Sequence, residues 1–146
     1  MSVEFQKAID RKKILRFPQG KHLVKEEFKQ SQDDLKEAAD RFGSGKYKYA
    51  TITGYYSMFH SARALLYSKG YREKSHYFLI VALTSLYVEK ALLSEDMVKE
   101  LHDAMVLRED ADYHAKFSRE GAETVLKAAE ELLRASKSIL KVEHKT

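Results

Sequence analysis

The sequence predicts an all-α protein, built as an antiparallel up-and-down bundle of four to five helices. Apolar residues recur at helical spacing over nearly the whole chain, with Lys, Glu and Asp between them. One Pro and six Gly in 146 residues are too few for the many turns of an all-β sandwich or barrel. The connections between the helical segments are short, which favours antiparallel neighbours.

Residues 1–20 are expected to form an N-terminal extension, and residues 21–146 the bundle domain. An amphipathic helix is predicted over 4–16, ahead of Pro18, because a residue that precedes proline disfavours helical backbone. The first bundle helix is predicted over 21–42. The Gly-Ser-Gly sequence that follows ends it, since glycine readily takes the left-handed conformation found beyond helix ends.

The segment 47–69 carries the widest apolar face in the chain. Two adjacent stripes at helical spacing make up this face: Ile52, Tyr56, Phe59 and Leu66 in one, and Tyr55, Met58, Ala62 and Leu65 in the other. A helix that is apolar over so wide an arc contacts more than one neighbour. We therefore expect this helix at the centre of the bundle.

Three further helices are predicted after the central one. The apolar run 77–83 could form a buried strand, but the pattern continues through Val88 without a breaker and favours a helix over 76–90. Ser94 is the expected N-cap of the next helix, with Glu and Asp suited to its first turn. A polar break is expected over 110–118, and the last helix over 119–142.

Composition excludes several classes of protein. The chain has no Cys, which excludes a disulfide scaffold, a Cys-ligated zinc site, an iron–sulfur cluster and a cysteine nucleophile. This composition fits a reducing cytoplasm, which is the expected location. We expect no membrane association, since no apolar run reaches the ~18 residues of a span and the N-terminus lacks a signal-peptide core. The net charge of +4 permits nucleic-acid binding without requiring it.

No metal or cofactor is expected. Glu73 and His76 have Glu-x-x-His spacing, but a di-iron bundle needs two such motifs and two further glutamates. The six His include no pair four residues apart, which argues against a zinc site. The glycine-rich phosphate loops and the Gly-x-Ser-x-Gly motif of hydrolases are also absent from the sequence.

The segment from Arg108 to His114 carries the most reactive combination of side chains. Arginine suits phosphate recognition, and histidine moves protons near neutral pH, so the two together would suffice to cleave RNA without a metal. On an unbroken helix they lie about 120° apart and roughly 9 Å along the axis. They converge only if the helix ends near Asp110 or a second chain supplies the partner. Alternatively, Arg108 and Asp112 form an ordinary ion pair four residues apart, with Tyr113 in the core.

Two other histidines are candidates for binding roles. His60 lies on the central helix, where a hydrogen-bonded core or interface histidine is the common alternative. His76 follows Lys74 and Ser75 near a helix start, where the three could bind an anion.

Three motifs together resemble the HEPN domain, the "higher eukaryotes and prokaryotes nucleotide-binding" domain. The segment 55–66 (YYSMFHSARALL) resembles its second-helix signature. The pieces 69–71 and 74–76 resemble the next stretch, and Arg108 with 111–113 (ADY) resembles the last. The resemblance covers about Lys21 to Val142 and is strongest to small stand-alone prokaryotic HEPN proteins. It implies a four- to five-helix bundle, usually a homodimer.

The resemblance also implies an activity and a partner. Many such proteins are toxins encoded beside a minimal nucleotidyltransferase (MNT) antitoxin, and active members are metal-independent ribonucleases with an Arg-x4–6-His motif at the dimer cleft. Carried over, Arg108 binds phosphate and His114 transfers protons. The residues expected to contact RNA or a nucleotide are Lys74, Ser75, His76, Asp112, Tyr113, Tyr56 and His60.

Two positions depart from the toxin pattern. Glu109 directly follows Arg108, where active toxins often have Asn, Asp or His, and its charge would repel a phosphate. Lys116 stands where some toxins carry a Tyr that the partner adenylylates. These departures support an alternative function, a non-catalytic module that binds a nucleotide or docks the nucleotidyltransferase.

Overall fold

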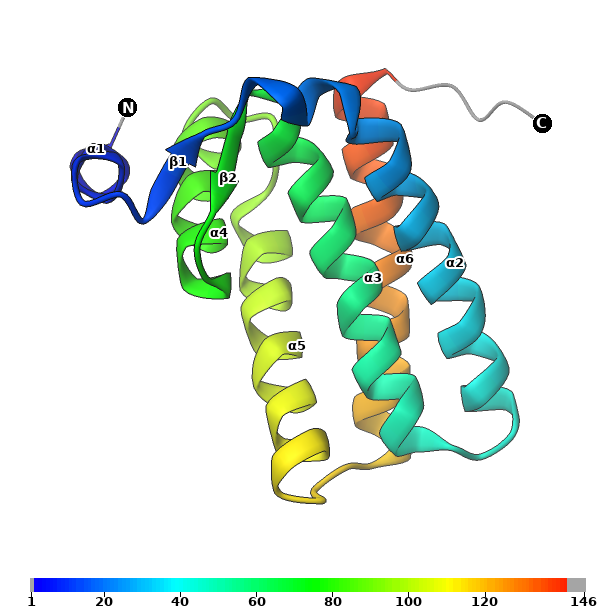
Figure 1. Ribbon diagram of the computed structural model, residues 1–146. Helices are drawn as coiled ribbons and strands as arrows, with labels where there is room; N and C mark the ends of the chain where they lie inside the picture. The colour runs from blue at the N-terminus through cyan, green and yellow to red at the C-terminus, as the bar shows by residue number, and fades with distance from the viewer. Residues whose placement is uncertain (1, 142–146) are drawn as a thin grey trace.

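The computed structural model describes residues 2–141 and confirms the all-α bundle (Figure 1). Four long helices run side by side with alternating direction, and two shorter helices and a two-stranded ribbon lie at one end. The elements in chain order are α1 (Val3–Asp10), β1 (Ile14–Arg16), a 3-10 turn η1 (Pro18–His22), α2 (Val24–Gly43), α3 (Tyr47–Ser68), β2 (Tyr71–Glu73), α4 (His76–Leu83), a π-helical turn η2 (Thr84–Val88), α5 (Glu95–Tyr113) and α6 (Arg119–Leu140).

Helix α3 is central, as its wide apolar face predicts. It packs against α2, α5 and α6, and it buries Tyr55, Met58 and Leu65 in the main core. Gly54 sets its closest approach to α6: a Cβ added at this glycine would lie 2.9 Å from Cγ1 of Val125. A side chain at this position would therefore require the Val125 side chain or the helix to shift.

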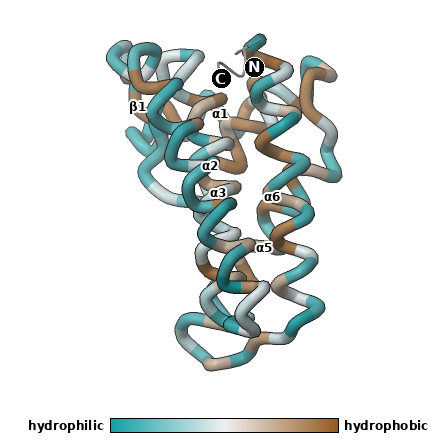
Figure 2. The backbone as a smooth tube through the Cα atoms, turned by 90° about the vertical axis from the view of Figure 1, so that its right-hand side faces the viewer, coloured by the Kyte–Doolittle hydropathy of each residue, from teal (hydrophilic) through white to brown (hydrophobic). Residues whose placement is uncertain are grey.

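The other long helices bury one face each. Figure 2 shows hydrophobic and hydrophilic residues alternating along α5 and α6. Serine side chains cap the starts of α4, α5 and α6, because the Oγ atoms of Ser75, Ser94 and Ser118 accept hydrogen bonds from backbone N–H groups in the first turn. The expected cap at Ser94 is thus confirmed, and so is helix over the apolar run 77–83.

The prediction of a helix over 4–16 is wrong in its second half. Helix α1 ends at Asp10, and Lys12 takes a left-handed backbone conformation with φ of 59°. The chain then pairs β1 antiparallel to β2, with Ile14 opposite Glu73 and Arg16 opposite Tyr71. This turn lets Ile14 join Phe5 in the main core, so the segment 2–20 packs against the bundle.

The polar break between the last two long helices is shorter than predicted. Helix α5 continues through Asp110 to Tyr113, and α6 begins at Arg119. Helix α6 ends at Leu140, and position 142, the predicted end, lies outside the described residues. Within residues 2–141, no helix is both long and apolar enough to cross a membrane.

Candidate functional site

Arg108 lies half-buried on α5, on the side that faces α3. Its Nη2 atom donates a hydrogen bond to the hydroxyl of Tyr56. Its Cζ atom lies 5.8, 5.3 and 5.6 Å from the ring centroids of Tyr55, Tyr56 and Tyr113. Such distances allow the guanidinium to be attracted to the faces of the rings.

No carboxylate within residues 2–141 forms an ion pair with Arg108. The expected alternative pair with Asp112 is therefore not formed. The Nε atom of Arg108 is also buried without a hydrogen-bond partner in the described structure. Three tyrosines thus hold the guanidinium in place while its positive charge stays uncompensated, and this arrangement suits an incoming anion.

His76 joins the same cluster through Tyr55. The Tyr55 hydroxyl and Nδ1 of His76 lie 2.7 Å apart. Burial raises the pKa of Tyr55, so its hydroxyl keeps its proton. Burial, together with the charges of Arg108 and Arg63, lowers the pKa of His76, which keeps the imidazole neutral at pH 7. With the hydroxyl protonated and the imidazole neutral, the two groups form a neutral hydrogen bond in which either one can be the donor.

The lowered pKa of His76 predicts a pH dependence of stability. The unfolded chain takes up a proton at the ordinary pKa of 6.5, before the folded protein does. The contribution of neutral His76 to the free energy of unfolding is complete above about pH 6.5. It declines on acidification, by at most about 1.4 kcal/mol per pH unit. Urea unfolding of wild type and His76→Gln at pH 7.5, 6.5 and 5.5 should show their stability difference shrinking as the pH falls. A difference that stays constant contradicts this assignment.

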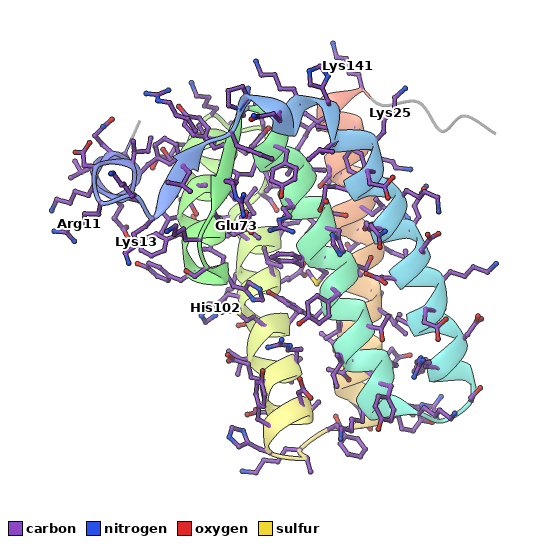
Figure 3. The ribbon with its side chains drawn as sticks, viewed as in Figure 1. Arg11, Lys13, Lys25, Glu73, His102 and Lys141 are labelled. Atoms are coloured by element: carbon purple, nitrogen blue, oxygen red, sulfur yellow. The ribbon has the colours of Figure 1, made fainter. Side chains whose placement is uncertain are left out.

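Arg63, about two turns beyond Tyr56 on α3, contrasts with Arg108 because its charge is compensated. Its Nε atom lies 3.2 Å from Oε2 of buried Glu73, although the angle is poor for a hydrogen bond. Burial raises the pKa of Glu73, against the opposing effect of Arg63. Glu73 points toward α3 in Figure 3. Glu73 and His76 thus have different partners, and among the described residues no His, Asp and Glu cluster could hold a metal.

His114 lies apart from this cluster in a single chain. It is the C-cap of α5, with its side chain 61% exposed and Nδ1 3.3 Å from Oδ1 of Asp110. Arg108 and His114 of one chain could converge only if the helix ended near Asp110. Because α5 is unbroken through Tyr113, this possibility is excluded. Tyr113 is 67% exposed, so the alternative that places it in the core is also wrong.

The remaining predicted binding residues have other partners or stand alone. His60 contacts α2, with Nδ1 2.8 Å from Glu27 and Nε2 3.7 Å from Asp34, so its contacts join α3 to α2 within the bundle. Ser75 caps α4, while Lys74 is exposed next to it. Of the predicted residues, the structure brings together Arg108, Tyr56, Tyr113 and His76.

Sequence reasoning missed Tyr55 as a functional residue. Its position in an apolar stripe identifies it only as core, and its partner His76 is 21 residues away. A buried tyrosine usually finds a hydrogen-bond partner. A tyrosine in an apolar stripe is therefore the one feature of the sequence that could have indicated a polar contact at Tyr55.

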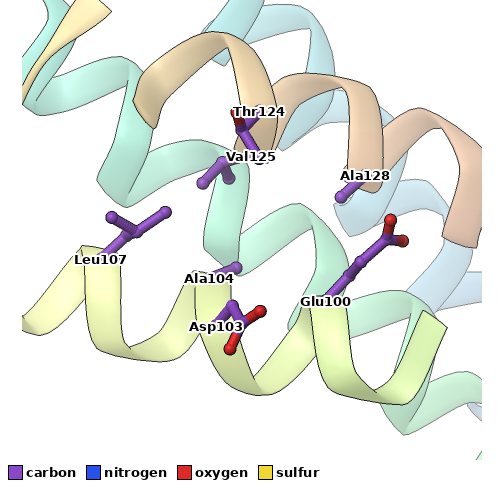
Figure 4. Close-up of a pocket in the computed structure, with 7 residues that line it drawn as sticks. All are labelled: Glu100, Asp103, Ala104, Leu107, Thr124, Val125 and Ala128. Carbon is purple, nitrogen blue, oxygen red and sulfur yellow. The ribbon is translucent and has the colours of Figure 1, made fainter. Parts of the chain in front are cut away.

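A small recess between α5 and α6, away from the Arg108 cluster, is not a candidate for the functional site (Figure 4). Its volume is about 40 Å³, well below the roughly 300–1,000 Å³ of small-molecule pockets. Glu100 and Asp103 line it, and burial together with neighbouring carboxylates raises the pKa of Glu100. An acidic recess of this size would repel an anionic ligand.

The fold and the cluster define a class of protein, an all-α bundle whose polar centre is an arginine held by tyrosines. The HEPN domain matches residues 24–139 of the chain. The chain therefore belongs to the HEPN family.

The relatives agree with this assignment. The chain is 33% identical over 106 residues to a UPF0332 protein of Archaeoglobus fulgidus, covering 71% of this chain and 84% of that protein. It is 30% identical over 112 residues to "Putative toxin MJ0605" of Methanocaldococcus jannaschii, covering 76% and 84%. The crystal structure of TT1696 from Thermus thermophilus has the same fold, with a TM-score of 0.69 at 18% identity, covering 80% of this chain and 98% of that one.

Proposed function

We propose that this HEPN protein is a metal-independent ribonuclease toxin. The observation that carries the proposal is the half-buried Arg108, which no carboxylate in the described part of the chain neutralises. A guanidinium held in this way can bind the scissile phosphate with its fork and stabilise the charge of a pentavalent phosphorane. The relative named as a toxin supports the biological role.

In this reaction the 2′-hydroxyl of RNA attacks the adjacent phosphorus. The bond to the 5′-oxygen breaks, leaving a 2′,3′-cyclic phosphate on one fragment and a 5′-hydroxyl on the other. The attacking hydroxyl loses a proton and the leaving oxygen gains one, and imidazoles carry out both transfers near neutral pH. The neutral imidazole of His76 can donate a hydrogen bond to a phosphate oxygen in the tautomer that carries its proton on Nε2.

A homodimer is part of the proposal because one chain does not complete the site. Within one protomer, His114 follows Arg108 by six positions, which corresponds to about 9 Å along the axis of the unbroken helix. If two copies meet at the ends of α5, His114 of each faces the shared cleft, and one can act as base while the other acts as acid. Pairing the copies also doubles the positive charge around one phosphate.

The test is incubation with single-stranded RNA in excess EDTA. Wild type should produce fragments ending in a 2′,3′-cyclic phosphate, and His114→Ala should lower the rate by about 100-fold or more. His102→Ala is the matched control, since His102 is an exposed histidine on the same helix. Cleavage of a fully 2′-deoxy substrate contradicts the reaction, and full activity in His114→Ala contradicts the role of that residue.

A second candidate function is a non-catalytic module that binds a nucleotide or docks a partner. Glu109 supports it, because this exposed carboxylate directly follows Arg108. The exposed position of His114 at the end of an unbroken α5 supports it as well. This function predicts nucleotide binding that depends on Arg108, measured by calorimetry, without RNA cleavage by the free protein.

For either function we propose an MNT-type nucleotidyltransferase as the partner. The support is the family resemblance together with the toxin name of a relative. A neighbouring reading frame with Gly-Ser followed by Asp-x-Asp would identify this partner, and co-purification of the two proteins would test the complex.

A further inference from the structure

The net positive charge of the protein lies in its N-terminal segment. Residues 1–22 contain six Lys and Arg but two acidic residues, so they carry the whole net charge of +4. The rest of the chain, which includes the HEPN match, has balanced charges. Such an excess of charge on one segment attracts polyanions toward it.

The fold gathers part of this charge around a recess of about 210 Å³ between α1, the turn before β1 and the start of α4. Lys7, Arg11 and Lys13 line it, together with Glu4 and Tyr77. Arg11 and Lys13 project from the same edge of the molecule, beneath α1 in Figure 3. Three cations thus surround one recess.

These cations have no ion-pair partner within residues 2–141. The two carboxylates of the segment are engaged by neutral groups: Glu4 accepts a hydrogen bond from the Tyr77 hydroxyl at 3.0 Å, and Asp10 accepts one from Gln6 at 3.1 Å. Three cations therefore outnumber the single carboxylate, Glu4, that lines the recess, and this excess of positive charge favours an anion.

Tyr77 adds a stacking surface to the charge. Its ring is 55% exposed, and Phe78 supports it edge-on with centroids 5.0 Å apart. Cations beside an exposed aromatic ring form the usual surface for single-stranded nucleic acid, where phosphates meet the charges and a base stacks on the ring. The recess is smaller than the roughly 300–1,000 Å³ of small-molecule pockets, so it suits one unit of a polymer.

The recess is next to the Arg108 cluster along the chain. His76 faces Tyr55 in that cluster, and Tyr77, the next residue, lines the recess. Exposed Lys74 is linked to the same edge, because its backbone N–H donates to the carbonyl of Lys13 at 3.0 Å. Both places thus include residues from the start of α4.

We propose that this recess, defined by Lys7, Arg11, Lys13 and Tyr77, is a second RNA-binding site that holds single-stranded substrate upstream or downstream of the Arg108 centre. The inference rests on the proposed ribonuclease function. The three cations of this site come from a segment outside the HEPN match, and Tyr77 comes from within it. The site determines affinity for long RNA without taking part in the cleavage step.

The test measures binding of an uncleavable 2′-deoxy-substituted single strand by fluorescence anisotropy at several salt concentrations. The triple variant Lys7→Gln, Arg11→Gln, Lys13→Gln should weaken binding at least about tenfold, and should reduce the slope of log K against log salt by about 2, since each phosphate contact contributes about 0.7. The matched control is Lys25→Gln, Lys36→Gln, Lys127→Gln, which has the same net charge and substitutes exposed lysines on α2 and α6. It should change both quantities far less.

A pair of single variants tests the stacking separately. Tyr77→Ala should weaken binding about tenfold, while Tyr77→Phe keeps the ring and should stay within about twofold of wild type. Equal losses in the triple variant and its control overturn the proposal. Unchanged RNA binding in the triple variant also overturns the proposal. This holds even if the same variant loses binding to an acidic protein, since the recess would then be a protein-binding site.

The design separates this proposal from the ribonuclease proposal. Binding of an uncleavable strand needs no catalysis, so it can be confirmed even if wild type cleaves nothing. If wild type does cleave, a dinucleotide too short to reach the recess should be cleaved equally well by wild type and the triple variant.

Discussion

Replacing Arg108 with Ala is expected to lower the rate of RNA cleavage in EDTA by about 100-fold or more. A preorganised donor aimed at the charge of a transition state typically contributes about 10²–10³ in rate. Arg108 fits that role because Tyr56 and the rings of Tyr55 and Tyr113 hold it while no carboxylate in the described chain neutralises it. The measurement is kcat/KM on single-stranded RNA, with detection of the cyclic phosphate.

Two further variants separate charge from geometry. Arg108→Lys keeps the positive charge but loses the planar fork, so we expect activity between those of wild type and Arg108→Ala. Arg134→Ala removes an exposed arginine of α6 and should keep activity within about twofold. Circular dichroism must show that all three variants are folded. Arg108→Ala with more than half of wild-type activity contradicts the proposed site.

Phe5→Ala is expected to lower the free energy of unfolding by about 3–5 kcal/mol, the typical cost of truncating a buried phenylalanine. Phe5 is 0% exposed, and its ring packs edge-to-face on Tyr71 with centroids 5.3 Å apart. The measurement is urea unfolding followed by circular dichroism at fixed pH.

Val3→Ala is the matched control for this variant. Val3 is on the same helix but 70% exposed, so its truncation should change stability by no more than about 0.5 kcal/mol. A loss below about 1 kcal/mol in Phe5→Ala would mean that α1 contributes little to the core. The expected loss matters because Phe5 precedes the HEPN match at residues 24–139, and truncation at its boundary would remove part of the same hydrophobic core.

The bundle could be predicted from the sequence because its signals are local. Helical spacing on α3 requires a wide buried face, and the structure buries Tyr55, Met58 and Leu65 there. Ser94 could be identified as a cap from the acidic residues that follow it. The helix over 4–16 was wrong because a tertiary contact decides it: β1 exists only where β2 pairs with it.

The candidate site was predicted in part. Arg108 stands out in the sequence, and the resemblance directs attention to it, but its partners come from α3 and its neighbour His76 from α4. These pairings join residues 52 and 21 positions apart, so spacing along one helix could not reveal them. Spacing instead paired Arg108 with Asp112, a contact that the described structure does not contain.

The sequence by itself determined that this chain is helical, which helix is central and which arginine is worth examining, because apolar periodicity and caps act within a few residues of the chain. Only the tertiary structure decided that Arg108 has tyrosine partners in place of a carboxylate, that the pKa of His76 is lowered, and that the basic N-terminal segment folds against the start of α4. Those properties depend on burial and on charges brought together from distant segments, and neither exists until the chain has folded.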